Sequence, residues 1–459
     1  MTDNKQIMYL NNKVKHVHFI GIGGIGMCGL AEYLLVKGYK VTGSDSTKTF
    51  ITERLERKGA AVYYSHSSDN IKKGIHLVVF TSAVKQDNPE YKKAVALKIN
   101  TIKRAVLLGE LVNGMNLIAV SGTHGKTSTT SMIASILIKS GIDPTVFVGG
   151  NLDILDGASY RIGKGNYAVV EADEYDRSFL TLRPNVIVVN NIELDHIDIY
   201  KNEKTLKAAF KSFLGNLKDN GTIVANYDDK NVKELVDPID EMVIDYGING
   251  TNRISDVKMT KSRTTFKLND FKIELSIPGY HNVYNASAAV CSTIFVSKSA
   301  SIFRSLKEFK GVKRRLELKY ESRNIKVYDD YAHHPSEVLS SLKSLRDIDK
   351  NGLTVVYQPH TYSRTKQFYK EFAKSLSVAD KVYLLPVYAA REKAMKGVDS
   401  KLIFNLIKKS KSDKHLVEDE NSLYDSLIKS INKGDRVVFQ GAGDVTNICD
   451  KFIKRIKSK

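Results

Sequence analysis

The chain has 459 residues, 42% of them hydrophobic and 26% charged, a composition typical of a globular protein with about three domains. The 70 Lys and Arg residues against 51 Asp and Glu residues give a formal net charge of +19, which fits either a nucleic-acid binder or a lysine-rich surface. The lysines favour the second interpretation, because pairs such as Lys72–Lys73 and Lys92–Lys93 are scattered and not interleaved with arginines and aromatic residues. A positive field would attract phosphorylated ligands in both cases.

The cysteines and the amino terminus indicate where the protein works. Cys28, Cys291 and Cys449 lie far apart and form neither a CxxC pair nor a disulfide framework, which favours a reducing compartment. The segment MTDNKQIMYLNNKVKHVHFI contains no apolar signal core, and no apolar run approaches the ~20 residues that span a bilayer. We therefore expect a cytoplasmic protein with neither a membrane nor a nucleic acid as partner.

The first predicted elements are a strand, a glycine turn, a helix and a second strand, in the sequence VKHVHFIGIGGIGMCGLAEYLLVKGYKVTGSD. The turn contains Gly21, Gly23 and Gly26 in the pattern GxGxxG, and Asp45 ends the second strand. This arrangement is a dinucleotide fingerprint. The glycines indicate only that a diphosphate can approach the backbone, so NAD and a nucleotide-sugar both remain open.

The next elements repeat the order strand, glycine turn and helix in NLIAVSGTHGKTSTTSMIASILIKSG. The strand is predicted over residues 117–121, and the helix ends at Gly141. The intervening GTHGKT resembles a phosphate loop shortened by two residues, since Thr123 and His124 alone separate Gly122 from Gly125. A loop between a strand and a helix directs backbone N–H groups at an anion. We expect a solvent-facing Lys126 to reach the terminal phosphates of a nucleoside triphosphate and Thr127 to hold Mg²⁺. The alternative is a plain glycine turn before a helix.

A metal site is expected at the ends of the following strands, predicted over residues 167–171 and 186–190. The first ends in Glu171, and the second leads to Asp195 and His196. Carboxylates and an imidazole at adjacent strand ends suit Mg²⁺, which keeps several waters and takes few protein ligands. Zinc is not favoured, because the chain has no HExxH motif and no cysteine near these residues.

A third group of elements begins near residue 311. Four apolar runs there end in polar residues: IKVYDDYAHHPSE, LTVVYQPHTYSRT, KVYLLPVYAAREK and RVVFQGAGDVTN. Ligands of open parallel sheets bind outside the carboxyl ends of the strands, so these polar ends indicate a site. We predict an α/β protein of three domains: a Rossmann-like βαβ domain over 1–110, a phosphate-loop ATPase-like domain over 111–310 and a Rossmann-like α/β domain over 311–459.

The motifs resemble, in order and spacing, those of the Mur ligases of peptidoglycan synthesis. They are GIGGIGMCGLAEYL, GTHGKTSTT, EADEYDRSFL, NNIELDHIDIY, GYHNVYNASAA, GVKRRLE, DDYAHHPSE, QPHTYSRT and GAGDVTN. The shortened loop is that family's own form. The resemblance implies a cytoplasmic enzyme that uses ATP and Mg²⁺ to join L-alanine to the lactyl carboxylate of UDP-N-acetylmuramate through an acyl phosphate, acting as a monomer or homodimer.

The resemblance also implies a role for each matching residue. The UDP-sugar would be bound by Gly21, Gly23, Gly24, Ile25 and Gly26, with Ser82 and Arg104 in the same domain. ATP would be bound by Gly122, Thr123, His124, Gly125, Lys126, Thr127, Ser128, His281, Asn282, Asn285, Arg314 and Asp330. The metal would be held by Thr127, Glu171 and His196. The amino acid would be placed by Tyr331, His333, His334 and Arg364. Lys126, Glu171, His196 and Arg364 would act in catalysis.

Two other functions stay open at this point. A ligase that attaches a recycled tripeptide to the same nucleotide shares the central and C-terminal motifs, but its N-terminal glycine loop differs from GIGGIGM. A nucleotide-binding regulatory protein with a decayed ATP site is the alternative of another class. The intact Lys126, Thr127, Glu171 and His196 favour an active enzyme over this regulator.

Overall fold

The computed structural model describes residues 9–196, 198–260, 263–322, 325–348, 351–390, 392–408 and 412–458. The chain forms two compact units. The first comprises Met1–Asn252 with Ala288–Ile302, and the second comprises Arg253–Ser287 with Phe303–Lys459.

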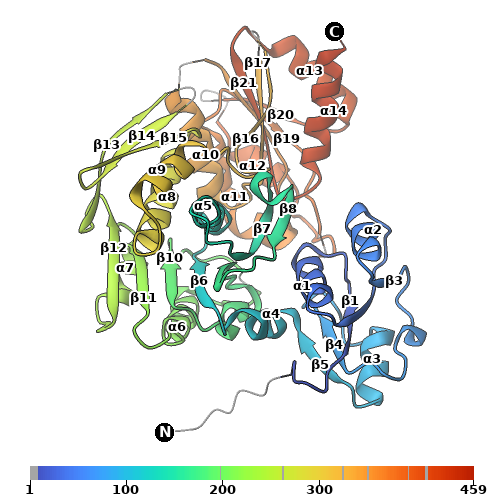
Figure 1. Ribbon diagram of the computed structural model, residues 1–459. Coiled ribbons are helices and arrows are strands. Elements are labelled where there is room, and N and C mark those ends of the chain that lie inside the picture. The colour runs from blue at the N-terminus through green and yellow to red at the C-terminus, as the bar shows by residue number, and fades with distance from the viewer. Residues whose placement is uncertain are drawn as a thin grey trace. The chain divides into compact units, whose positions relative to one another are not determined.

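The first unit begins with a parallel five-stranded sheet in the order β3-β2-β1-β4-β5, drawn in blue in Figure 1. Its strands are β1 (His16–Ile20), β2 (Lys40–Ser44), β3 (Ala61–Tyr63), β4 (Leu77–Phe80) and β5 (Asn100–Lys103). Every residue of β1 is buried, as expected of a central parallel strand whose two faces are both covered. The strand order reverses between β1 and β4, which makes the carboxyl ends of these strands the place for a ligand.

The helices of this sheet are α1 (Ile25–Val36), α2 (Phe50–Arg57), α3 (Pro89–Ala96) and α4 (Arg104–Val112). Two of the four, α2 and α3, begin after side chains that cap them. The hydroxyl of Thr49 accepts a hydrogen bond from the backbone of Thr52 to cap α2. Asn88 caps α3 just before Pro89, whose fixed backbone angle suits the first helical position.

A second sheet of the first unit has the order β12-β11-β10-β6-β9-β7-β8, in which only β8 runs antiparallel to its neighbour. Its strands are β6 (Asn116–Ser121), β7 (Thr145–Leu152), β8 (Ala158–Arg161), β9 (Tyr167–Glu171), β10 (Val186–Val189), β11 (Thr222–Asn226) and β12 (Met242–Gly247). The helices are α5 (Lys126–Lys139), α6 (Glu203–Leu214) and α7 (Lys230–Val236), with a 3₁₀ segment, η3, at Tyr175–Thr181. The phosphate loop therefore leaves the middle of this sheet, from β6 into α5.

The two sheets of the first unit share one hydrophobic core that runs from Val14 to Val236. Their clearest junction is Tyr160 on β8, whose hydroxyl donates to the buried carboxylate of Glu32 on α1. A Cβ placed on Gly29 of the same helix would come within 2.7 Å of the Tyr160 ring. The glycine thus allows the ring to lie directly on the helix.

The second unit contains an antiparallel meander and a mostly parallel sheet. The meander is β13 (Asn252–Met259), β14 (Thr264–Leu268) and β15 (Phe271–Leu275). The sheet has the order β16-β17-β21-β18-β19-β20, and only β16 is antiparallel to its neighbour. These strands are β16 (Glu317–Glu321), β17 (Ile325–Asp330), β18 (Leu353–Tyr357), β19 (Lys381–Leu384), β20 (Asp413–Leu416) and β21 (Asp435–Gln440).

The remaining helices are α8 (Tyr280–Thr293), α9 (Ser299–Lys307), α10 (Pro335–Ile348), α11 (Tyr362–Leu376), α12 (Lys401–Leu406), α13 (Glu420–Ser430) and α14 (Val445–Lys457). The strands β17, β18, β19 and β21 run parallel, so their polar carboxyl ends meet at one edge of the sheet, as the sequence predicts. Among the residues described, no helix is both long and apolar enough to cross a membrane.

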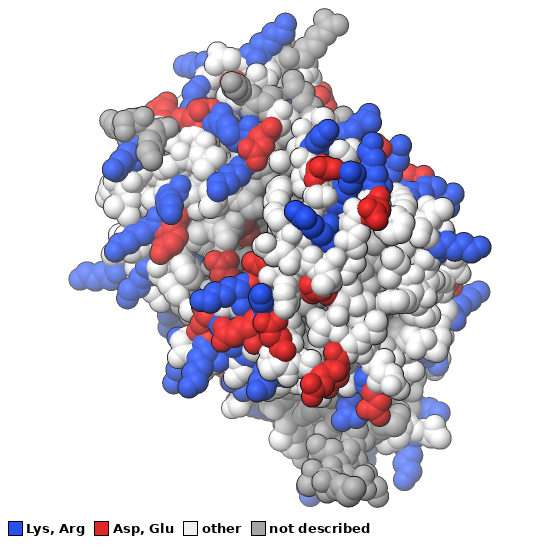
Figure 2. Space-filling view, turned by 90° about the vertical axis from the view of Figure 1, so that its left-hand side faces the viewer, with Lys and Arg blue, Asp and Glu red and all other residues white. Residues whose placement is uncertain are grey.

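Charged side chains of both signs share one face of the protein (Figure 2), and the three cysteines are buried. On the face drawn in Figure 2, Lys and Arg side chains are interspersed with Asp and Glu. Cys28, Cys291 and Cys449 are free and buried. Burial raises the pKa of the Cys28 thiol to about 11 and that of Cys291 to about 12, so neither thiol has reactive thiolate character.

Candidate active site

The phosphate loop is shaped by two glycines with left-handed backbone angles. Gly122 has φ of +131° and Gly125 has φ of +79°, values that disfavour any residue with a side chain. Gly125 directly precedes α5. The amides of Thr123 and His124 donate to the backbone and side-chain oxygens of Asn191, over 3.1 Å and 2.8 Å. Because these two amides are already engaged, an anion in this loop would be bound by the N–H groups at the amino end of α5.

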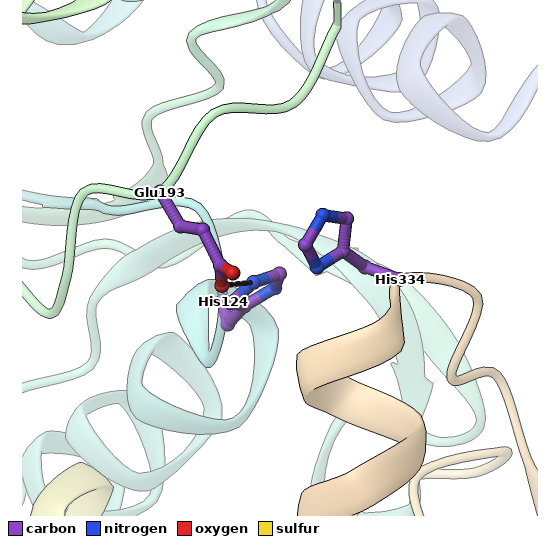
Figure 3. A group of neighbouring side chains, drawn as sticks. All are labelled: His124, Glu193 and His334. Atoms are coloured by element: carbon purple, nitrogen blue, oxygen red, sulfur yellow. Dashed lines mark hydrogen bonds and ion pairs between the residues drawn. The ribbon is translucent and has the colours of Figure 1, made fainter. Parts of the chain in front are cut away.

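Figure 3 shows His124 of this loop and Glu193, from the segment that follows β10, pointing toward one another. The Nε2 atom of His124 lies 2.9 Å from a carboxylate oxygen of Glu193. The hydroxyl of Thr123 also donates to the Glu193 carbonyl over 2.8 Å. The segment carrying Asn191 and Glu193 thus fixes the first half of the loop.

Lys126 lies in a different setting from the one expected, because its side chain is only 11% exposed. Its ammonium donates to the carboxylate of Glu174 over 2.8 Å and 3.1 Å, and to the carbonyl of Gly122 over 2.7 Å. Burial alone would lower the pKa of Lys126, but the carboxylates of Glu174, Asp173 and Glu171 outweigh it and raise the pKa. The prediction that Lys126 faces solvent is wrong, since a buried carboxylate holds it.

The residues expected to bind metal, Thr127, Glu171 and His196, fall into two groups. Thr127 donates through its hydroxyl to Glu171 over 3.1 Å, and the other oxygen of Glu171 accepts from the backbone N–H of Gly149 over 2.6 Å. The ring of His196 instead lies 3.7 Å from Glu174, and these two with Asp173 could together ligate an ion. Oxygen and imidazole donors of this kind fit Mg²⁺.

Asp173 and Glu174 are the residues that the sequence analysis missed here. Glu174 is 1% exposed, and burial raises its pKa although Lys126 counteracts this effect. His196 has φ of +52°, an uncommon conformation for a residue other than glycine, as expected where a side chain is held for function. The acidic residues in EADE were the signal that could have identified Asp173 and Glu174. Only Glu171 lies at the end of β9, and the other two come after it.

The glycine loop of the first sheet is closed by side chains from neighbouring elements. The amide of Gly23 donates to Asp45 over 2.9 Å, and a Cβ on Gly23 would meet this carboxylate and Thr52 at 2.9 Å. A Cβ on Gly26 would lie 3.0 Å from the side chain of Arg104. The carboxylates of Asp173 and Glu171 act on the pKa of Arg104, which burial lowers. The predicted residues Gly26 and Arg104 thus lie together.

Ser82 lies farther along the same edge, in a cavity of about 400 Å³ whose lining includes Phe80, Lys103, Tyr175 and Asp176. Its hydroxyl donates to Asp176 over 2.7 Å, and Lys103 approaches the same carboxylate at 2.7 Å. Asp176 has φ of +51°. The cavity offers both charges, a hydroxyl and aromatic rings to a polar ligand.

The residues expected near the nucleotide in the second unit are held by local hydrogen bonds. His281 lies 3.2 Å from the hydroxyl of Ser340, and burial lowers its pKa to about 4. Asn282 donates to the carbonyl of Pro278 over 2.7 Å and accepts from Asn285 over 3.2 Å. These side chains stabilise the start of α8.

Arg314 and Tyr331 lie in contact at the carboxyl edge of β17. The guanidinium of Arg314 lies 4.8 Å from the centre of the Tyr331 ring and donates to the carbonyls of Gly441 and Gly443 over 3.0 Å and 3.1 Å. Asp330 is buried, accepts from Leu316 and Gln440, and has a raised pKa because of its burial. Asp330 therefore supports this edge from within.

Two of the expected amino-acid residues, His333 and Arg364, contact His360, which the sequence analysis missed. The His360 ring lies 5.9 Å from that of His333, and its Nδ1 atom is 3.3 Å from the guanidinium of Arg364. His333 contacts the carbonyl of Tyr331 at 3.0 Å, and His334 contacts Ser336 at 2.6 Å. The position of His360 in QPHTYSRT, at the end of β18, was the signal that could have identified it.

Comparison with known families covers most of the chain. Residues 16–115 match the Mur ligase family catalytic domain, 120–293 the Mur ligase middle domain and 314–443 the glutamate ligase domain of Mur ligases. The chain belongs to the Mur ligase family. The predicted family and the predicted α/β class with three domains are thereby confirmed. The exact domain boundaries and the site residues stay predictions.

Individual Mur ligases are similar over nearly the full length. The UDP-N-acetylmuramate–L-alanine ligase of Acetivibrio thermocellus is 43% identical over 454 residues, which cover 96% of each chain. The ligase of the same name from Aquifex aeolicus is 42% identical, with 97% of this chain and 99% of the relative covered. The crystal structure of UDP-N-acetylmuramate–alanine ligase from Thermotoga maritima superimposes with a TM-score of 0.81 at 30% identity, covering 96% of this chain and 99% of that one.

A murein peptide ligase from Psychrobacter arcticus has the same fold at lower identity. Its structure gives a TM-score of 0.69 at 23% identity and covers 96% of this chain and 98% of its own. At this identity the likeness concerns the fold alone.

Proposed function

We propose that this Mur ligase joins L-alanine to the lactyl carboxylate of UDP-N-acetylmuramate, with hydrolysis of ATP to ADP and phosphate, in an early cytoplasmic step of peptidoglycan synthesis. Full-length relatives at 42–43% identity carry that name. The structural observation that carries the proposal is the contact between the loop after β6 and the end of β9. Lys126 lies at the start of α5 and binds Glu174, and Thr127 contacts Glu171. A decayed regulatory protein would not need to keep these side chains together.

In the proposed reaction a lactyl carboxylate oxygen attacks the γ-phosphorus of ATP, and ADP leaves. The amine of L-alanine then attacks the acyl phosphate, and phosphate leaves as the amide forms. Attack of an anion on a polyanion needs neutralisation of charge, which positioning and electrostatics supply. Lys126 and the amino end of α5 would supply it at the phosphates.

Mg²⁺ would be held by Thr127, Glu171 and His196, and would neutralise charge on the nucleotide. The contact between Thr127 and Glu171 supports this assignment, because hydroxyl and carboxylate oxygens 3.1 Å apart can face one ion. The contact of His196 with Glu174 adds Glu174 to the candidate ligands.

The other substrates are assigned by where their candidates lie. The glycine loop with Ser82 and Arg104 would bind the UDP-sugar. The glycines let the diphosphate of this substrate come close to the backbone N–H groups. Asn282, Asn285, Arg314 and Asp330 would serve ATP. Tyr331, His333, His334 and Arg364 would place L-alanine, and His360 joins this group because it contacts Arg364. We expect small molecules as the only partners and a monomer or homodimer.

The experiment measures phosphate release with ATP, Mg²⁺ and UDP-N-acetylmuramate, and compares L-alanine, glycine, L-serine and a tripeptide as amine. We expect the highest kcat/KM with L-alanine. Higher kcat/KM with the tripeptide would replace the proposal by the recycling ligase. Absence of release with every amine, in protein shown to be folded, would favour the regulatory alternative.

The metal assignment is tested with Glu171→Ala and His196→Ala at increasing Mg²⁺. Each should lose most activity, and high Mg²⁺ should restore part of it, because water can replace a lost ligand. The matched control is Glu203→Ala, since Glu203 is half-exposed on α6 and pairs with Lys207. Normal, Mg²⁺-independent activity in both site variants would place the metal elsewhere.

A further inference from the structure

A buried polar network lies in the first sheet, apart from the phosphate loop and the candidate metal site. Its centre is Glu90 on α3, which is fully buried. The Glu90 carboxylate accepts hydrogen bonds from Ser44 and Asn70, each over 2.6 Å, and lies 3.1 Å from the Nδ1 atom of His66. Burial opposes the charge of Glu90, yet its hydrogen-bonding neighbours and the His18 ring, 3.6 Å away, hold the pKa of this carboxyl below its ordinary value.

The network fixes which nitrogen of His66 carries hydrogen. Ser44 has one hydroxyl hydrogen and donates it to Glu90. The Nδ1 atom of His66 then faces two oxygens, at 3.0 Å on Ser44 and 3.1 Å on Glu90, and can satisfy either only as a donor. In the neutral ring, hydrogen on Nδ1 leaves Nε2 as an acceptor.

His66 is also the only one of these three side chains that reaches the surface. Its side chain is 33% exposed, whereas Glu90 and Ser44 are fully buried. It follows the end of β3, next to the end of β2, where Ser44 is followed by Asp45. In doubly wound sheets the ribose of a nucleotide lies at the end of the second strand, with its diphosphate at the glycine turn, so the base extends past that point.

We propose that His66 recognises the N3–H group of a uracil base through Nε2, and that Glu90 positions His66 by keeping its ring hydrogen on Nδ1. This inference rests on the proposed function, which assigns the glycine loop to a uridine nucleotide. Uracil presents a hydrogen at N3, whereas cytosine presents a lone pair there. The pair would therefore make the site selective for uracil over cytosine, with His66 as a specificity residue and Glu90 as a positioning residue.

Binding measurements with UDP alone and CDP alone test the selectivity. We expect the wild-type protein to bind UDP at least about tenfold more tightly than CDP, the effect of one lost or opposed hydrogen bond. His66→Ala should weaken UDP binding and remove most of the difference, and Glu90→Gln should reduce it. The matched control is His76→Ala, because His76 is exposed just before β4 starts, at the opposite end of the strands. It should keep the wild-type preference.

A second measurement stands even if Glu90→Gln fails to fold. Long-range ¹⁵N–¹H correlation spectra of the wild-type protein at alkaline pH report the tautomer of each histidine, and His66 is assigned by comparison with His66→Ala. We expect hydrogen on Nδ1 of His66. Hydrogen on Nε2, or equal affinity for UDP and CDP, would overturn the inference. The proposed function would still stand in that case, provided that UDP binds. Failure to bind UDP would overturn both.

Discussion

At the scale of single residues, the most consequential contact is the buried pair of Lys126 and Glu174. The pair restrains the lysine that the reaction needs, and it means that Lys126 also contributes to stability. Removing one partner of a buried pair leaves an uncompensated charge, which typically costs about 3–5 kcal/mol. Loss of activity in a single Lys126 variant would therefore not separate catalysis from folding.

We predict that Lys126→Met lowers both activity and stability, and that Lys126→Met combined with Glu174→Gln recovers stability without activity. The double variant removes both charges, while the lost contact to the transition state still costs ~10²-fold or more in kcat. Urea unfolding and phosphate release measure the two effects separately. Turnover above about a hundredth of wild type in the stable double variant would contradict the role of Lys126.

At the scale of elements, helix α1 carries a glycine, Gly29, at the point where the Tyr160 ring packs against it. Glycine inside a helix normally destabilises it by up to about 1 kcal/mol relative to alanine. A Cβ at Gly29 would, however, come within 2.7 Å of Tyr160. We predict that Gly29→Ala destabilises the protein by about 1–3 kcal/mol, the usual cost of overpacking.

The reference for that prediction is the same substitution in a Tyr160→Ala background. There the clash is gone, so Gly29→Ala should be neutral or stabilising, and the difference between the two backgrounds measures the contact. Denaturant midpoints of the four proteins provide the cycle. Equal effects of Gly29→Ala in both backgrounds would mean that the ring moves away without cost.

Strand β1 carries a histidine that should make stability depend on pH. The pKa of His16 is lowered to about 4, first by burial and then by Lys40, from about 6.5 in the unfolded chain. The unfolded chain binds more protons between these values, so this contribution is complete above pH 6.5 and is lost as pH falls toward 4. His16→Gln should flatten the decrease in urea midpoint across this range. Parallel wild-type and variant curves would contradict the assignment.

At the scale of the whole molecule, the sequence predicts the three-domain α/β fold because parallel strands read as apolar runs that end in polar residues. It misses the hairpin of β7 and β8. It also misses the meander β13–β15, whose half-exposed strands mix charged and apolar residues. The sequence identifies Thr127 and Glu171 as site residues because each stands in a motif at or just after the end of a predicted strand. It misses Glu174, whose partner Lys126 lies 48 residues away in the chain, and the resemblance includes the motif of His360 without assigning that residue a role.

We also predict that binding of both nucleotides brings the two units together. All candidates for the UDP-sugar belong to the first unit, whereas those for ATP and L-alanine include residues of the second. A reaction between these substrates requires closure around them. Small-angle scattering should show a smaller radius of gyration with UDP-N-acetylmuramate and a non-hydrolysable ATP analogue together than with the UDP-sugar alone. An unchanged radius would contradict closure.

The shared core of the first unit has a consequence for the order of events during synthesis on the ribosome. The first sheet and α1 emerge before Tyr160, so the helix surface around Gly29 and Glu32 has no cover until the β7–β8 hairpin has left the exit tunnel. The nascent first domain thus leaves this helix surface uncovered for the time needed to add about fifty further residues, several seconds at bacterial elongation rates of about 5–20 residues per second. A fragment ending near residue 115 would lack Tyr160 altogether, so it would keep this helix surface uncovered and leave Glu32 without the hydroxyl that donates to it.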